Sequence, residues 1–196
     1  QAGLGLVSET QQLLALWTPE LNPQGLYKTA LVSGQFSNVT ARRLRNIVVE
    51  GFSPRYLVEN GNPARLLKSA MGKVSSADFR TLCFVFTCRA NSILGDFVRQ
   101  VYWPAYSAGK NSITKREALD FVGAAVSNGL THRPWAASTI SRVSGYLLGS
   151  CADFGFLGAN KAGARSVQTF RISPTVASAL AHDLHFRGIG DNALLR

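Results

Sequence analysis

The chain has 196 residues, 46% of them hydrophobic and 16% charged, which suffices for a sizeable core and excludes a largely disordered chain. It carries 21 Lys and Arg against 11 Asp and Glu, a formal charge of +10. With so few charges in total, this excess leaves basic patches, which favour polyanions such as nucleic acid or an acidic membrane surface. The charge says nothing about the fold.

Neither a secretory signal nor a membrane span is predicted. The opening residues, QAGLGLVSETQQLL, lack a basic region and a continuous apolar run. The most apolar stretch, residues 81–88, is far shorter than the roughly 20 residues of a spanning helix. Cys83, Cys88 and Cys151 form no C-x-x-C pair and have apolar neighbours, which predicts buried thiols. We expect a cytoplasmic protein with no metal, no cofactor and no membrane partner.

Cap signals divide the chain into many helices. A polar residue followed by proline satisfies a first-turn N–H where the proline needs no donor. This pair recurs at Asn22-Pro23, Ser53-Pro54, Asn62-Pro63 and Ser173-Pro174, and capping-box spacings occur at Ser8 with Gln11 and Thr114 with Glu117. Together with apolar periodicity, these signals predict helices near residues 8–17, 23–33, 40–50, 54–60, 63–71, 76–90, 92–107, 115–128, 138–153 and 174–186.

The expected fold is mainly α, a multi-helix bundle of two packed subdomains. The segment GKVSS, residues 72–76, is the best boundary, and it separates an N-terminal helical subdomain (1–74) from a C-terminal one (75–196). Pro104 should kink or end the helix at 92–107.

The helix at 40–50 carries the first candidate site, within TARRLRN. Leu44, Ile47 and Val48 form its buried side. Arg42, Arg43 and Arg45 then occupy the exposed arc, where a planar guanidinium suits a phosphate. The alternative is a solvated face with local ion pairs. This basic run, a second one near the C-terminus and the global charge together favour nucleic acid.

The helix at 138–153 buries Ile140, Val143, Leu147 and Cys151. Its other face carries Arg142 and a stripe of small residues at helical spacing, Ser141, Gly145 and Gly149. Small side chains permit the close approach of another surface. That surface is either a DNA groove, with Arg142 on a phosphate or base edge, or a tightly packed helix.

A small β-hairpin is expected at about residues 156–172. Gly155 ends the helix, Gly and Ala allow a turn, and alternation from Ser166 to Ile172 predicts a strand. Helix, strand, basic tip and strand form a winged-helix-like layout, with Lys161 and Arg165 at the tip and Arg171 as a secondary candidate for DNA binding. The alternative is a hairpin that only covers the core, its cations guarding the edge.

Catalysis has little support, and we do not expect an enzyme. His182 and His185 lie one turn apart without a third metal ligand at a suitable spacing. The chain lacks phosphate-loop, nucleophile-elbow and zinc-protease motifs.

Several longer motifs form a recognisable pattern. They are ADFRTLCFVFTCRANSILGDFVRQVYWPAYSAGKNSITKREALDFV at residues 77–122, STISRVSGYLLGSCADFGFLG at 138–158 and GLVSETQQLL near the start. This pattern resembles the BrxA family of bacterial BREX phage-defence systems. The resemblance implies a small, mostly helical, non-enzymatic component of that gene set that binds DNA. It transfers no individual contact residue.

Two functions follow as hypotheses. The first is a DNA-binding accessory protein, acting on double-stranded DNA and beside other BREX components. The second is a protein–protein adaptor in a defence complex, for which the small-residue face of residues 138–153 is the docking surface. Helical proteins of this charge also bind structured RNA, as antitermination factors do.

Overall fold

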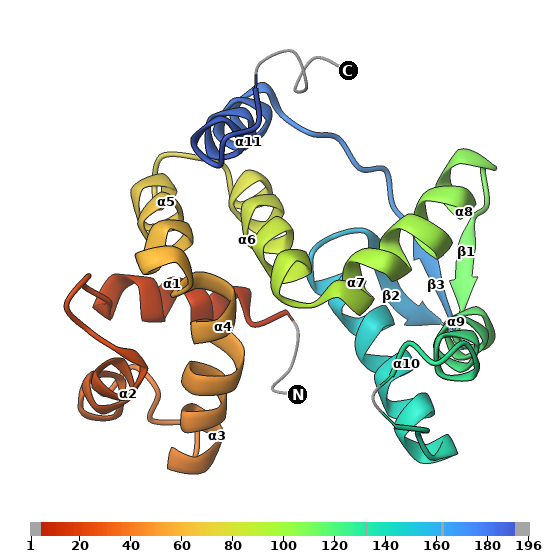
Figure 1. Cartoon of the computed structure of the whole chain (residues 1–196), viewed down its shortest axis with the longest axis horizontal. Coiled ribbons are helices and arrows are strands. Elements are labelled where there is room, and N and C mark those ends of the chain that lie inside the picture. Colours follow the sequence, from red (N-terminus) through yellow and green to blue (C-terminus); the bar gives the residue numbers. More distant parts are fainter. Residues whose placement is uncertain (1–4, 132, 162, 191–196) are drawn as a thin grey trace.

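The computed structural model describes residues 5–131, 133–161 and 163–190, without the side chains of Asn160 and Lys161. Its elements, shown in Figure 1, are α1 (Val7–Leu16), α2 (Pro23–Val32), α3 (Ala41–Arg45), η1 (Asn46–Phe52), α4 (Ser53–Tyr56), η2 (Glu59–Gly61), α5 (Asn62–Ala70), α6 (Ser76–Ala90), α7 (Ser92–Phe97), η3 (Val98–Tyr102), α8 (Trp103–Ser107), β1 (Ser112–Thr114), α9 (Lys115–Ser127), α10 (Ala137–Asp153), β2 (Leu157–Lys161), β3 (Ala164–Val167) and α11 (Pro174–Phe186). The predicted mainly α fold with a small β element is confirmed.

The helices form two lobes joined by α6 (Figure 1). The N-lobe, defined as α1 to α5, lies on one side of α6. The C-lobe, defined as α7 to α10 with the sheet, lies on the other. Helix α11 follows the C-lobe in sequence but packs against α6, on the side of the N-lobe. The division into subdomains 1–74 and 75–196 stays a prediction, because one hydrophobic cluster runs from Leu13 to Val176 through both lobes.

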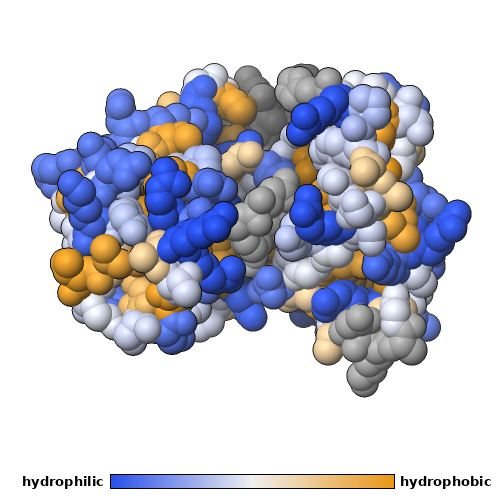
Figure 2. All heavy atoms as spheres, turned by 90° about the horizontal axis from the view of Figure 1, so that it is seen from below, coloured by the Kyte–Doolittle hydropathy of each residue, from blue (hydrophilic) through white to orange (hydrophobic). Residues whose placement is uncertain are grey.

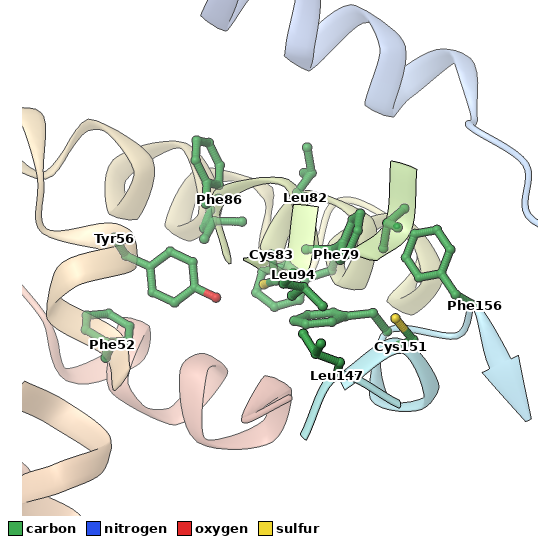
Figure 3. Packing of buried hydrophobic residues seen from close by; sticks show 14 of the residues in the cluster. Phe52, Tyr56, Phe79, Leu82, Cys83, Phe86, Leu94, Leu147, Cys151 and Phe156 are labelled. Atoms are coloured by element: carbon green, nitrogen blue, oxygen red, sulfur yellow. The ribbon is translucent and has the colours of Figure 1, made fainter. Parts of the chain in front are cut away.

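Helix α6 supplies the centre of that cluster. Towards the N-lobe, the buried ring of Phe86 faces the region of Tyr56, whose hydroxyl lies 3.4 Å from Thr87 Oγ1 (Figure 3). Towards the C-lobe, Phe84 packs on Phe156 with ring centroids 4.4 Å apart. Because apolar residues occupy both sides of α6, the helix shows almost no amphipathic pattern, which is typical of a helix buried between two layers.

Two π-helical segments let proline occur inside long helices. Residues 41–56 and 92–107 are each continuous helices, although a break before Pro54 and a kink or end at Pro104 were expected. The N–H groups of Ser53 and Trp103 bond to carbonyls five residues back, at Val48 and Val98. This wider turn moves the carbonyl with which a proline ring otherwise clashes, so both helices continue.

The predicted caps are confirmed at four helix starts and wrong at three. The side chains of Asn22, Ser75, Thr114 and Ser173 each accept a first-turn N–H. Helices α1 and α5 instead begin after Leu6 and Gly61, which both have positive φ. Ser53 lies inside a helix and its hydroxyl donates to the carbonyl of Val48 at 2.7 Å.

A three-stranded antiparallel sheet with the order β1-β3-β2 closes the C-lobe. The predicted hairpin is present as β2 and β3, and β1, which pairs Ser112 with Ser166, was not predicted. Gly158 is required, since a Cβ there would lie 2.3 Å from Ser166 Oγ.

The expected strand to Ile172 ends early, at Val167. Beyond it, Tyr102 Oη donates to the Gln168 carbonyl at 2.9 Å and Phe170 stacks on Phe156 at 4.4 Å. These contacts draw the chain out of the sheet.

No single helix in the described ranges is long and apolar enough to cross a membrane. The pair Ser76–Ala90 and Ser92–Ser107 reaches that length and composition together but bends by 114° between its two parts.

The capping box at the start of α9 offers a stability test. Thr114 Oγ1 accepts the Glu117 N–H, and the Glu117 carboxylate accepts the Thr114 N–H at 2.8 Å. We expect Thr114→Ala to lower the free energy of unfolding by about 1 kcal/mol. Thr169→Ala, at an exposed position outside the helices, is the control and should leave it unchanged. Urea unfolding measures both, and equal effects would contradict the capping role.

Glu117 also predicts a pH dependence. Burial acts to raise its pKa, but hydrogen bonds from Lys110 and Thr114 together hold the pKa below its usual value of 4.5. A pKa lower in the folded chain than in the unfolded chain stabilises the fold above the unfolded pKa, and this contribution is lost as pH falls through the folded pKa. We expect Glu117→Gln to remove this part of the acid sensitivity in urea titrations between pH 3 and pH 6, values that bracket the unfolded pKa of roughly 4.3.

Candidate nucleic-acid interface

The arginines of α3 are fixed by the local fold and open to solvent. Thr40 caps the helix by accepting the Arg43 N–H, and Leu44 points into the core with 1% of its surface exposed. This anchoring turns Arg42, Arg43 and Arg45 outward, and all three are exposed. Within the described chain none of the three forms an ion pair, so the alternative of a locally neutralised face is not what the structure has.

The second basic site lies on α10. Val143, Leu147 and Cys151 are buried as predicted, and Arg142 on the opposite face is exposed. Nothing lies within 4 Å of a Cβ built at Gly145 or Gly149. The expected alternative of a tightly packed helix on this stripe is therefore absent from the part of the chain that is described, and the face is open to a partner.

The pairing of α9 with α10 sets the direction of that face. The buried hydroxyl of Ser144 donates to the Ala118 carbonyl of α9 at 3.1 Å and to its own helix at the Ile140 carbonyl. A Schellman-type end, with Gly155 at φ +89° and the Phe156 N–H bonded to the Cys151 carbonyl at 2.8 Å, turns the chain into β2. Helix α10 is thus held between α9 and the sheet.

The hairpin is less free than expected. Arg165 Nη1 donates to the Gly158 carbonyl at 3.0 Å, and its side chain is only partly exposed, so it braces the hairpin. Burial raises the pKa of Asp153, and the nearby positive charge of Arg165 opposes that rise. The side chain of Lys161 lies outside the described residues. Arg171 is exposed in the segment after the sheet.

The sites gather on one side of the molecule without merging. Helix α3 in the N-lobe and the first turns of α10 in the C-lobe both lie towards the lower edge of Figure 1. Figure 2 views that side, and hydrophilic residues lie on both lobes. The hairpin turn is tied elsewhere, because the Gly163 carbonyl accepts the Lys115 N–H at the start of α9.

Sequence reasoning missed two exposed cations near α10. Arg133 lies in the loop before α10, and Lys115 is the first residue of α9. Neither forms an ion pair with a described carboxylate. Both are single charges in the sequence, so only the spatial packing of α9 against α10 identifies them.

Metal and nucleophile chemistry find no geometric support within the described ranges. No group of three His, Cys, Asp or Glu side chains is placed to hold a metal ion there. Asp183, which lies between His182 and His185 in sequence, is bound by Arg89 at 2.6 Å.

The described cysteines are all free thiols, and burial raises the pKa of Cys83 and of Cys88 to about 12. Burial also raises the pKa of Cys151.

The fold and these surfaces define a basic, mainly helical protein whose exposed arginines face solvent from two lobes. The BrxA family model matches residues 1–183, and the chain belongs to the BrxA family, which implies a role in BREX phage defence. Comparisons with curated proteins and with solved structures gave no match.

The thiols predict an unreactive folded state. We expect iodoacetamide at pH 8 to leave all three cysteines unmodified in the native chain and to label all three in urea, because the reactive thiolate is suppressed by burial. Intact mass spectrometry measures the labelling. Rapid native labelling of any one cysteine would show an accessible, activated thiol.

Proposed function

We propose that the protein is a non-enzymatic DNA-binding component of its BREX system and contacts the phosphate backbone through α3 and α10. The observation that carries this proposal is the open, cationic face of α10, placed between α9 and a three-stranded sheet. Contact with DNA agrees with the cytoplasmic location and the neighbouring BREX components expected from the sequence.

The element order of the C-lobe supports a winged-helix interpretation. A helix (92–107) is followed by β1, α9, α10, β2 and β3, and β3 lies between the other two strands. In helix-turn-helix proteins the second helix of the pair enters the major groove, and its N-terminal residues approach the bases. Helix α10 has this place, with Arg142 in its second turn.

The open stripe on α10 suits a groove. A major groove about 12 Å wide admits a helix, and the closest backbone approach needs small side chains at the contact. Ser141, Gly145 and Gly149 supply them, and the structure places no other element against them. Since Arg142 is the one long cation on this stripe, phosphate contacts outnumber base contacts in the proposal and sequence preference is weak.

Helix α3 adds affinity without specificity. Three adjacent exposed guanidinium groups without local carboxylate partners attract phosphates through charge-assisted, bidentate hydrogen bonds. Each phosphate neutralised releases counterions, so binding should fall steeply with salt.

The first test removes the α3 charges. We expect Arg42→Gln, Arg43→Gln and Arg45→Gln together to weaken binding to unrelated duplexes and to reduce the slope of log affinity against log salt by about 2 to 3. The matched control replaces Arg65, Arg99 and Arg116 with Gln, the same change in net charge at positions with side-chain partners. Fluorescence anisotropy across a salt series measures both. Equal losses in the two triple variants would remove α3 from the interface.

The second test fills the α10 stripe. Gly145→Leu adds a side chain where nothing lies within 4 Å and replaces a poor helix former, so we expect the free energy of unfolding to stay equal or rise by up to about 1 kcal/mol. Duplex affinity should fall at least tenfold, a loss of about 1.4 kcal/mol of binding free energy, because the helix can no longer approach the groove. Gly123→Leu, on α9 and equally open, is the control. Unchanged affinity in Gly145→Leu would exclude α10 as the groove helix.

The same open face favours a second candidate, a protein–protein adaptor that docks a BREX component on α10. Gel shifts with unrelated DNA duplexes and structured RNA distinguish the two. A protein that shifts neither at low salt is an adaptor, and one that shifts only RNA binds RNA.

A further inference from the structure

Helix α11 has little apolar anchoring for its length. Val176 is the single buried residue among its 13 residues, and Ala179 and Leu180 are only partly buried against the core. By comparison, α6 buries seven of its 15 residues. Apolar burial therefore contributes far less to holding α11 than to holding the rest of the fold.

An extended segment, residues 168–173, joins α11 to the sheet. Its sheet end is fixed by Phe170, which stacks on Phe156, and by the Gln168 carbonyl, which accepts from Tyr102. From there the chain crosses from the C-lobe to α11 (Figure 1). Ile172 is 55% exposed, so the middle of the segment rests on nothing.

Charge fixes the far end of α11. The charge cluster, defined as Glu59, Arg89, Asp183 and Arg187, joins three elements. Asp183 of α11 accepts from Arg89 of α6 at 2.6 Å and from Arg187 at 3.2 Å, and Arg187 bonds to Glu59 of η2 at 2.7 Å. The cluster thus connects the C-terminal helix to the N-lobe and to α6.

Burial differs within the cluster. The Asp183 side chain is 11% exposed, whereas those of Arg187 and Glu59 are 30% and 45% exposed. Salt screens the more exposed pair most. A cavity of about 540 Å³, lined in part by Val58, Phe86 and Leu184, lies beside it, so apolar packing at this end of α11 is incomplete.

We propose that α11 is a detachable strap that ties the C-lobe to the N-lobe and is released when the charge cluster is screened or broken. Release leaves the core of α6 intact, because Val176 is its main apolar contribution to the cluster. The strap then controls how firmly the lobes carrying α3 and α10 are held relative to each other, and this last consequence for DNA binding rests on the proposed function.

Hydrogen exchange tests the strap without DNA. In Arg187→Glu we expect amide exchange in residues 174–187 to rise about tenfold, with α6 unchanged, because repulsion replaces attraction at Glu59. Glu59→Arg combined with Arg187→Glu should restore slow exchange. Raising NaCl from 0.05 to roughly 0.5 M should loosen α11 in the wild type as the screening length shortens.

The matched control is Asp120→Asn, which breaks the exposed ion pair with Arg116 inside α9. It should leave α11 exchange unchanged. Asp183→Asn provides a second variant with both native arginines retained, and it too should accelerate exchange in α11. The proposal is overturned if α11 exchange stays slow in Arg187→Glu and Asp183→Asn, if the charge swap fails to restore it, or if α6 opens together with α11.

Duplex affinity of the same variants separates the two proposals. If α11 loosens and DNA still binds, with a changed minimum duplex length, both stand. If α11 loosens in a protein that binds no DNA, the strap stands and the proposed function fails. If exchange does not change, the strap fails whatever the DNA result.

Discussion

The burial of α6 on both sides is the constraint on which the rest of the structure depends. Phe86 faces the N-lobe and Phe84 faces the C-lobe, so one helix serves as the core of two layers. Neither lobe has to close a core of its own, and each is free to present its polar helices outward. The exposed arginines of α3 and the open face of α10 are consequences of this arrangement, because apolar residues on their inner faces already fix both helices.

Local chemistry made most helices predictable, and non-local packing explains the differences. Asn22, Thr114 and Ser173 act as caps because each signal needs only the next three residues. Proline was misleading at Pro54 and Pro104, since a π turn costs little when flanking residues such as Phe52 and Tyr102 are fully buried and hold the helix in place. Strand β1 was missed because three residues carry no periodicity, and it exists only through its pairing with β3.

For the candidate site, residue type was readable and engagement was not. Arg42, Arg43 and Arg45 were identified from sequence, and their exposure follows from the buried Leu44 beside them. Arg165 was identified equally well, but its hydrogen bond to Gly158 depends on the register of β2 against β3. The openness of Gly145 likewise depends on what the rest of the chain leaves uncovered, which no local pattern encodes.

The distribution of carboxylates, more than that of cations, determines which basic residues remain available. The ion pairs in the described chain place carboxylates at Asp96, Glu117 and Asp120 of the C-lobe and at Glu59 and Asp183 around α11. Each serves a helix start, a helix surface or the strap. None reaches α3 or the exposed face of α10, so a chain with few acidic residues spends them on conformation and leaves its arginines at these two faces for an external anion.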